Sequence, residues 1–96
     1  MLTTETVDVG GASVLGIRID LGECPILMLV GRKGFVGCGY FKTEVADKVS
    51  HALAVVSGVR SFADVLTGKV QAVSGRASEL GIAAGMTGKQ AAKILA

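Results

Sequence analysis

Apolar and polar residues alternate along two stretches near the N-terminus, residues 5–9 and residues 12–21. A period of two is typical of strands with one buried face, and the Gly10-Gly11 pair between the stretches favours a tight turn. The alternation slips at Gly16, where we expect a β-bulge. Residues 1–22 are therefore predicted to form an N-terminal β-hairpin.

Residues 26–30 differ from these stretches because none of their side chains is polar. An apolar run of this length is typical of a strand with both faces covered, one by helices and the other by a sheet or a second subunit. Pro25 suits the first position of such a strand, since its missing N–H is tolerated there. Residues 35–41 follow as the partner strand, with Arg32-Lys33 at the tip of this central hairpin.

The spacing of apolar residues becomes helical after residue 42. The members of one helical stripe are Val45, Val49, Ala52, Leu53 and Val56. We therefore expect a helix that Thr43 caps and Gly58 ends. A serine at 61 with an acid at 64 has the spacing of a helix cap, which predicts a second, short helix ending at Gly68.

The C-terminal third contains one more strand pattern and two more helix starts. Residues 69–73 alternate and predict a late strand, after which Ser74 can cap a helix over residues 76–80. Thr87 and Gln90 have the form of a capping box for a final helix. Because most strands precede the helices, the sequence predicts an α+β domain. We expect a mainly antiparallel sheet, built from the N-terminal hairpin, the central hairpin and the late strand, with helices packed on one face.

Composition adds an expectation about assembly. The chain has 96 residues, of which 50% are hydrophobic and 19% are charged. This length predicts a single domain over residues 1–96, and so small a domain has little interior in which to bury its apolar residues. We therefore expect a homo-oligomer that buries a second apolar face between copies, with the N-terminal strands at the interface.

The charge of the chain and the length of its apolar runs argue against two kinds of partner, nucleic acid and membranes. The formal net charge is +2, and no basic run is longer than Arg32-Lys33. With few aromatic side chains as well, the chain is expected to have no nucleic-acid partner. No apolar stretch reaches the roughly 20 residues of a membrane helix, and the N-terminus lacks the features of a signal peptide. We expect a cytoplasmic protein with no membrane partner, in which Cys24 and Cys38 are free thiols.

Four glycines interrupt residues 31–41, GRKGFVGCGYF, among side chains that otherwise favour a strand. Glycine in a strand pattern indicates a turn, a bulge or a backbone that a ligand or another strand approaches closely. The candidate ligand-binding residues are Gly37, Cys38, Gly39 and Tyr40.

Cys38 is the candidate for chemistry, if any side chain carries it. Its glycine neighbours leave room for a reactant to reach the sulfur, which favours a nucleophile. The alternative is a buried thiol that packs as a small hydrophobe, with the glycines there for packing, because free cysteine is among the most buried residue types. Both interpretations stay open.

Other motifs are incomplete. Residues 81–89 superficially resemble a phosphate-binding loop, but Ala83 replaces the first glycine and Gln90 replaces the hydroxyl residue that would bind magnesium. Cys24, Cys38 and His51 lie 14 and 13 residues apart, a spacing that matches no compact pair of metal ligands. We expect no metal site and no cofactor.

Four short motifs occur in one order: residues 34–41 (GFVGCGYF), 56–59 (VSGV), 77–82 (ASELGI) and 85–88 (GMTG). In this combination the chain resembles the YunC-like family of small bacterial and archaeal proteins, a domain of unknown function. The resemblance implies an α+β fold and a tetramer assembled through the N-terminal strands. It brings no catalytic residue, so the matching positions Cys38, Gly39 and Tyr40 are candidates only.

Three kinds of function follow from these patterns. A small-molecule binding or regulatory module is favoured by the glycine-rich backbone at residues 37–39 and by helix N-termini at Thr43, Ser74 and Thr87 that could hold an anion. The alternatives are a structural protein whose assembly is its role and an enzyme with Cys38 as its nucleophile. The sequence does not decide whether the chain is an enzyme.

Overall fold

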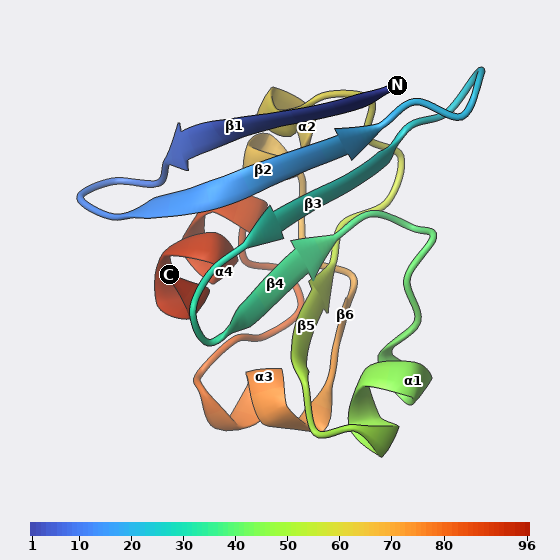
Figure 1. Cartoon of the computed structure of the whole chain (residues 1–96). Coiled ribbons are helices and arrows are strands. Elements are labelled where there is room, and N and C mark those ends of the chain that lie inside the picture. The colour runs from blue at the N-terminus through green and yellow to red at the C-terminus, as the bar shows by residue number, and fades with distance from the viewer.

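In the computed structural model, which describes residues 1–96, six strands form one sheet in their order along the chain (Figure 1). The strands are β1 (Leu2–Asp8), β2 (Ser13–Ile19), β3 (Ile26–Val30), β4 (Gly34–Gly37), β5 (Ala52–Val55) and β6 (Ala72–Val73). Neighbouring strands are antiparallel except β4 and β5, which are parallel. The predicted α+β class, its mainly antiparallel sheet and its N-terminal hairpin are confirmed.

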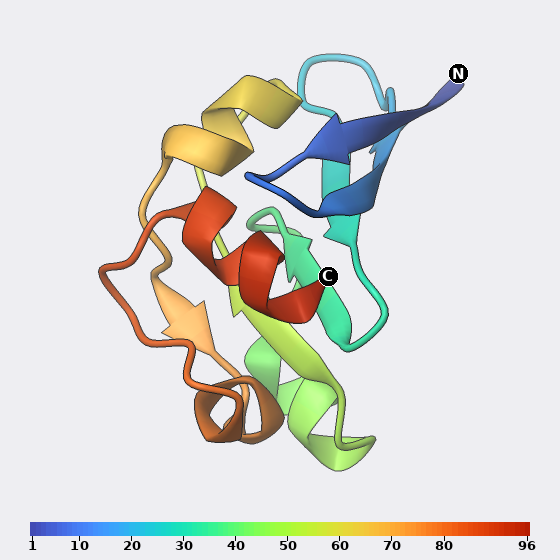
Figure 2. The same ribbon diagram turned by 90° about the vertical axis from the view of Figure 1, so that its left-hand side faces the viewer.

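Four helices complete the fold: α1 (Thr43–Lys48), α2 (Phe62–Thr67), α3 (Gly75–Glu79) and α4 (Gly88–Leu95). α4 lies over one face of the sheet with α2 beside it (Figure 2). α1 packs on the opposite face, where Ala46 contacts Leu53 and Val55 of β5, so the helices cover both faces of the sheet rather than the one face expected from the sequence. None of the helices has both the length and the hydrophobicity needed to cross a lipid bilayer.

The apolar run in β3 divides its side chains between the two faces. Leu27 and Leu29 are fully buried in the main core, together with Val36 of β4 and Leu95 of α4. The intervening side chains of β3 point to the other face and are only half-buried within a single chain. The prediction that a second subunit covers this other face therefore remains open.

The prediction of one helix between Thr43 and Gly58 is wrong in its second half. α1 ends at Lys48, the backbone turns at Ser50 with a φ of 58°, and Ala52–Val55 form β5. All four residues of β5 are buried. Pairing with β4, which gives this apolar segment a strand neighbour and cover on both faces, outweighs the helical spacing of its side chains.

Three local expectations also need correction. The late strand is limited to Ala72–Val73, and the second strand of the central hairpin, expected over residues 35–41, ends at Gly37. Gly16 forms no bulge, because it pairs in register with Glu5 on one side and Leu29 on the other. A β-carbon there would lie 2.9 Å from the Phe62 ring, so glycine is required by the close packing of α2.

Most predicted helix caps are confirmed. The side chain of Ser61 accepts a hydrogen bond from Asp64 N–H, and Thr87 and Gln90 form the reciprocal capping box. Ser74 caps α3 in the same way. Thr43 does not act as a cap, since α1 begins after Lys42, which makes no side-chain cap bond.

Candidate functional site

A pocket of about 440 Å³ opens where β4 and β5 end. It is lined by Cys24, Pro25, Cys38, Gly39, Tyr40, Gly58, Val59 and Arg60, and we call it the β4–β5 pocket. The lining comes from three segments: the turn before β3, the loop after β4 and the loop after β5.

The topology of the sheet explains why the chain leaves an opening here. β4 and β5 are parallel, so their carboxyl ends lie at the same edge of the sheet. The chain leaves β4 toward α1 on one face and leaves β5 toward α2 on the other, where Val65 joins the main core. In open α/β sheets, ligands bind outside the carboxyl ends of parallel strands where successive connections diverge, and the single parallel pair of this sheet has the same arrangement.

Cys38 lies at the wall of the β4–β5 pocket and is fixed to β3. Its backbone N–H donates to the Leu27 carbonyl at 3.1 Å, and its Sγ accepts from the Leu27 N–H at 3.5 Å. The residue is only 3% exposed. Cys24, two residues before β3, is exposed, and both cysteines are free thiols. The pocket therefore brings together two thiols that lie 14 residues apart in the sequence.

Three of the four ligand-binding candidates proposed from the glycine pattern lie at the pocket, and one does not. Cys38, Gly39 and Tyr40 line the β4–β5 pocket, whereas Gly37 does not. Gly37 is buried in β4 beneath the Phe41 ring, so its missing side chain serves packing within the chain.

Five lining residues were not singled out as site residues from the sequence: Cys24, Pro25, Gly58, Val59 and Arg60. Gly58 and Val59 belong to the VSGV motif, but the sequence pattern predicts only a helix end at Gly58. With β5 interpreted as helix, the loop that follows it could not be placed beside the loop after β4. A run of buried-type residues followed by glycine, as in residues 52–58, was the available signal.

The loops around the β4–β5 pocket contain unused backbone donors. The N–H groups of Gly39, Tyr40, Gly58 and Val59 donate no hydrogen bond within the chain. Regular pairing stops just before them, with Val56 N–H donating to the Gly37 carbonyl at 2.9 Å. Gly58 has a φ of 75°, a left-handed conformation that suits glycine and turns the chain sharply after β5. The N–H groups are free to bind a ligand or water.

The backbone of Arg60 is held by two hydrogen bonds, and its guanidinium forms no ion pair. Its N–H donates to the Asp64 carboxylate at 3.0 Å, and its carbonyl accepts from the Arg18 guanidinium at 2.7 Å. Its own guanidinium donates to the Glu23 carbonyl at 3.2 Å. The ion pairs of the structure join Arg18 to Asp20 and Arg76 to Glu79, so Arg60 has no carboxylate partner.

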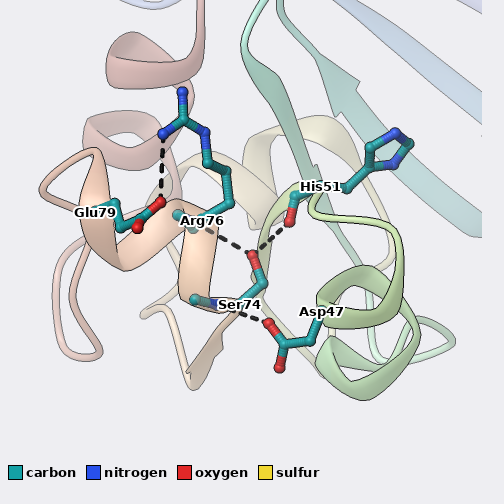
Figure 3. Close-up of polar contacts among 7 residues, drawn as sticks. Asp47, His51, Ser74, Arg76 and Glu79 are labelled. Atoms are coloured by element: carbon teal, nitrogen blue, oxygen red, sulfur yellow. Dashed lines mark hydrogen bonds and ion pairs between the residues drawn. The ribbon is translucent and has the colours of Figure 1, made fainter.

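Two of the three helix N-termini considered from the sequence, those of α3 and α4, are occupied by the chain itself, whereas the α1 N-terminus has no side-chain cap. Ser74 and Thr87 cap their own helices, and the Asp47 carboxylate accepts from Gly75 N–H at 2.7 Å. His51 contributes its carbonyl to the Ser74 hydroxyl, while its imidazole points away from this network (Figure 3). No group of three metal-binding side chains occurs in the structure.

The fold and the β4–β5 pocket define a small α+β domain in which one parallel strand pair interrupts an antiparallel sheet. Its sequence matches the family described as "Domain of unknown function (DUF1805)" over residues 37–95, more than half of the chain. The chain belongs to this family. The resemblance to a domain of unknown function is thereby confirmed.

The fold is also similar to a solved archaeal structure, described as the crystal structure of a protein of unknown function, TA1206, from Thermoplasma acidophilum. The TM-score is 0.93 and the sequence identity 31%, and the similarity covers 100% of this chain and 94% of that chain. No curated protein matches this chain.

Proposed function

We propose that this domain is a cytoplasmic module that binds a small molecule in the β4–β5 pocket. The observation that carries the proposal is that the chain diverges after two parallel strands, and that four backbone N–H groups of the two loops that follow have no partner within the chain. The pocket volume of about 440 Å³ lies within the range of small-molecule sites, roughly 300–1,000 Å³. Binding there would make the domain a sensor or carrier of that molecule.

A ligand screen with a blocked pocket tests this proposal. Wild-type protein is screened by thermal shift against nucleotides, sugar phosphates, carboxylates, amino acids and neutral metabolites at millimolar concentration. Val59→Phe fills the pocket, and Ala63→Phe adds the same ring on the exposed surface of α2 as the matched control. We expect a ligand that raises Tm for wild type and Ala63→Phe but not for Val59→Phe. If no compound raises Tm, or if Val59→Phe responds as wild type does, the proposal fails.

The face of the sheet opposite α4 supports a second role, self-association. Three cross-strand rows cover β1, β2 and β3: Thr6, Leu15 and Val30; Thr4, Ile17 and Met28; Leu2, Ile19 and Ile26. We call these residues the open face. Leu15 is 44% exposed and Leu2 is 65% exposed. No helix lies in front of these strands in Figure 1, whereas α2 and α4 lie behind them.

A second copy of the chain fits the open face better than a charged partner does. None of its nine residues is charged, so two identical faces can pack together without burying an unpaired ion. β1 is also an edge strand with unpaired N–H and C=O groups. We propose a homo-oligomer through the N-terminal strands, and the resemblance to YunC-like proteins favours a tetramer.

Light scattering coupled to size-exclusion chromatography tests the assembly. Leu15→Glu places a carboxylate on the open face at a residue that is already exposed in the single chain. Val45→Glu makes the same change at a 62% exposed residue of α1, outside the open face. We expect Leu15→Glu to lower the mass toward the 9.7 kDa protomer and Val45→Glu to leave the oligomer intact. A wild-type protein that is monomeric at micromolar concentration would contradict the proposal.

A further inference from the structure

We infer that the ligand of the β4–β5 pocket is an anion, a small molecule with a carboxylate or phosphate group, and that Arg60 binds it. This inference rests on the proposed function, because it concerns the chemistry of the same pocket. It commits the site to one class of ligand and one binding residue.

The first argument is the charge balance of the pocket lining. Arg60 is its only guanidinium or ammonium group, and no Asp or Glu lines the pocket. Of the neighbouring acids, Asp20 pairs with Arg18, and the Asp64 carboxylate accepts from the Arg60 backbone N–H. The Glu23 side chain forms no ion pair, and only its backbone carbonyl contacts Arg60. Because the lining itself holds one cationic side chain and no carboxylate, it complements an anion better than a cation.

The second argument is the remaining hydrogen-bonding capacity of Arg60. Its contact with the Glu23 carbonyl uses one Nη and leaves the other N–H groups without protein partners. A guanidinium presents paired donors that match two oxygens of a carboxylate or phosphate. The backbone of Arg60 is meanwhile held from both sides, by Asp64 and by Arg18. The side chain therefore extends from a fixed point at the rim of the pocket.

The third argument comes from the backbone. Gly39 and Tyr40 follow β4, Gly58 and Val59 follow β5, and the N–H groups of all four lack partners. The pocket lining therefore combines N–H groups that have no partner within the chain with one guanidinium, and both are donors that suit anionic oxygens. A neutral ligand would satisfy some of these donors but would leave the charge of Arg60 unused.

Amide chemical shifts in a titration series test this inference. Inorganic phosphate and succinate are the anionic probes, succinamide is the neutral counterpart of succinate, and sodium chloride holds ionic strength constant. We expect saturable shifts at Gly39, Tyr40, Gly58 and Val59 with phosphate, succinate or both, and none with succinamide. Phosphate alone would identify a phosphorylated ligand class, and succinate alone a carboxylate class.

Two variants distinguish a specific contact between the anion and Arg60 from a general effect of positive charge on anion binding. Arg60→Gln removes the charge at the pocket, and Arg76→Gln removes the same charge from α3, outside the pocket. We expect Arg60→Gln to weaken anion binding about tenfold or more and Arg76→Gln to change it less than about twofold. Unchanged Tm values of both variants without ligand would show that the fold is retained.

The outcomes distinguish the inference from the proposed function. If the pocket binds succinamide or a neutral metabolite equally well in wild type and Arg60→Gln, the anion inference is overturned while the pocket proposal stands. Equal losses in Arg60→Gln and Arg76→Gln would overturn the role of Arg60. If neither anions nor neutral compounds shift the pocket amides, both proposals fail together.

Discussion

The hydroxyl of Ser74 donates a 2.7 Å hydrogen bond to the backbone carbonyl of His51, which precedes it by 23 residues (Figure 3). The same oxygen accepts from the N–H groups of Leu53, at 2.9 Å, and Ala77, at 3.3 Å. Ser74 is fully buried, and this arrangement leaves no buried side-chain polar atom unsatisfied. One side chain thus joins the start of β5 to the start of α3, and β5 in turn places one loop of the β4–β5 pocket.

Ser74→Ala should therefore be strongly destabilising. The substitution leaves two buried N–H groups and one carbonyl without their hydroxyl partner, at a cost of about 2–3 kcal/mol. For a domain of this size that cost corresponds to a fall in Tm of roughly 10 °C or more. Ser78→Ala, at an exposed position of α3, is the control and should change Tm by no more than a degree or two. Thermal denaturation curves that coincide for the two variants would contradict this role of Ser74.

Gly88 and Gly75 offer a matched pair of glycines, each at the first position of a capped helix. A β-carbon at Gly88 would collide with the Val65 carbonyl oxygen, whereas at Gly75 it would lie 3.5 Å from the Asp47 carboxylate, an ordinary contact. We expect Gly88→Ala to cost about 2 kcal/mol or more, because α4 must move away from α2. Gly75→Ala should be neutral or stabilise by about 0.5 kcal/mol, since alanine restricts the unfolded chain. Urea denaturation measures both, and similar unfolding free energies would refute the proposed contact between the helices.

Leu29 and Leu15 test the assignment of the two sheet faces. Leu29 is fully buried in the main core, while Leu15 lies on the open face and is 44% exposed. Leu29→Asp should abolish soluble protein, because a carboxylate buried without a partner costs several kcal/mol, a large part of the stability of a domain. Leu15→Asp should leave the fold intact, as far-UV circular dichroism can show. Normal expression and melting of Leu29→Asp would mean that β3 is misplaced.

The parts of the fold that local signals specify were predictable from the sequence. The β1–β2 hairpin follows from alternation around Gly10-Gly11, and the helix starts at Ser61 and Thr87 follow from capping residues at fixed spacing. β5 was not predictable by the same rules. Its Ala-Leu-Ala-Val sequence continues the spacing of a helical stripe, and its strand state depends on pairing with β4, a contact absent from local sequence.

The candidate site, like the fold, has one part that was predictable from the sequence and one part that was not. The glycines around Cys38 marked one wall of the β4–β5 pocket, because glycine spacing is a local signal. Arg60 could not be recognised, since its importance comes from its place beside the loop after β4 and from the absence of a carboxylate partner. Both are properties of the folded chain.

Alkylation by iodoacetamide separates the two interpretations of Cys38. Cys24 is exposed, whereas Cys38 is 3% exposed and its sulfur accepts a hydrogen bond from the Leu27 N–H. We expect Cys24 to react within minutes in the folded protein and Cys38 to react only after denaturant is added, as mass spectrometry of tryptic peptides would show. Cys38→Ala should then lower stability by about 1–2 kcal/mol, because the thiol is packed in the core. Faster alkylation of Cys38 than of Cys24 would instead favour the nucleophile, because a buried thiol that reacts first must be activated by its surroundings.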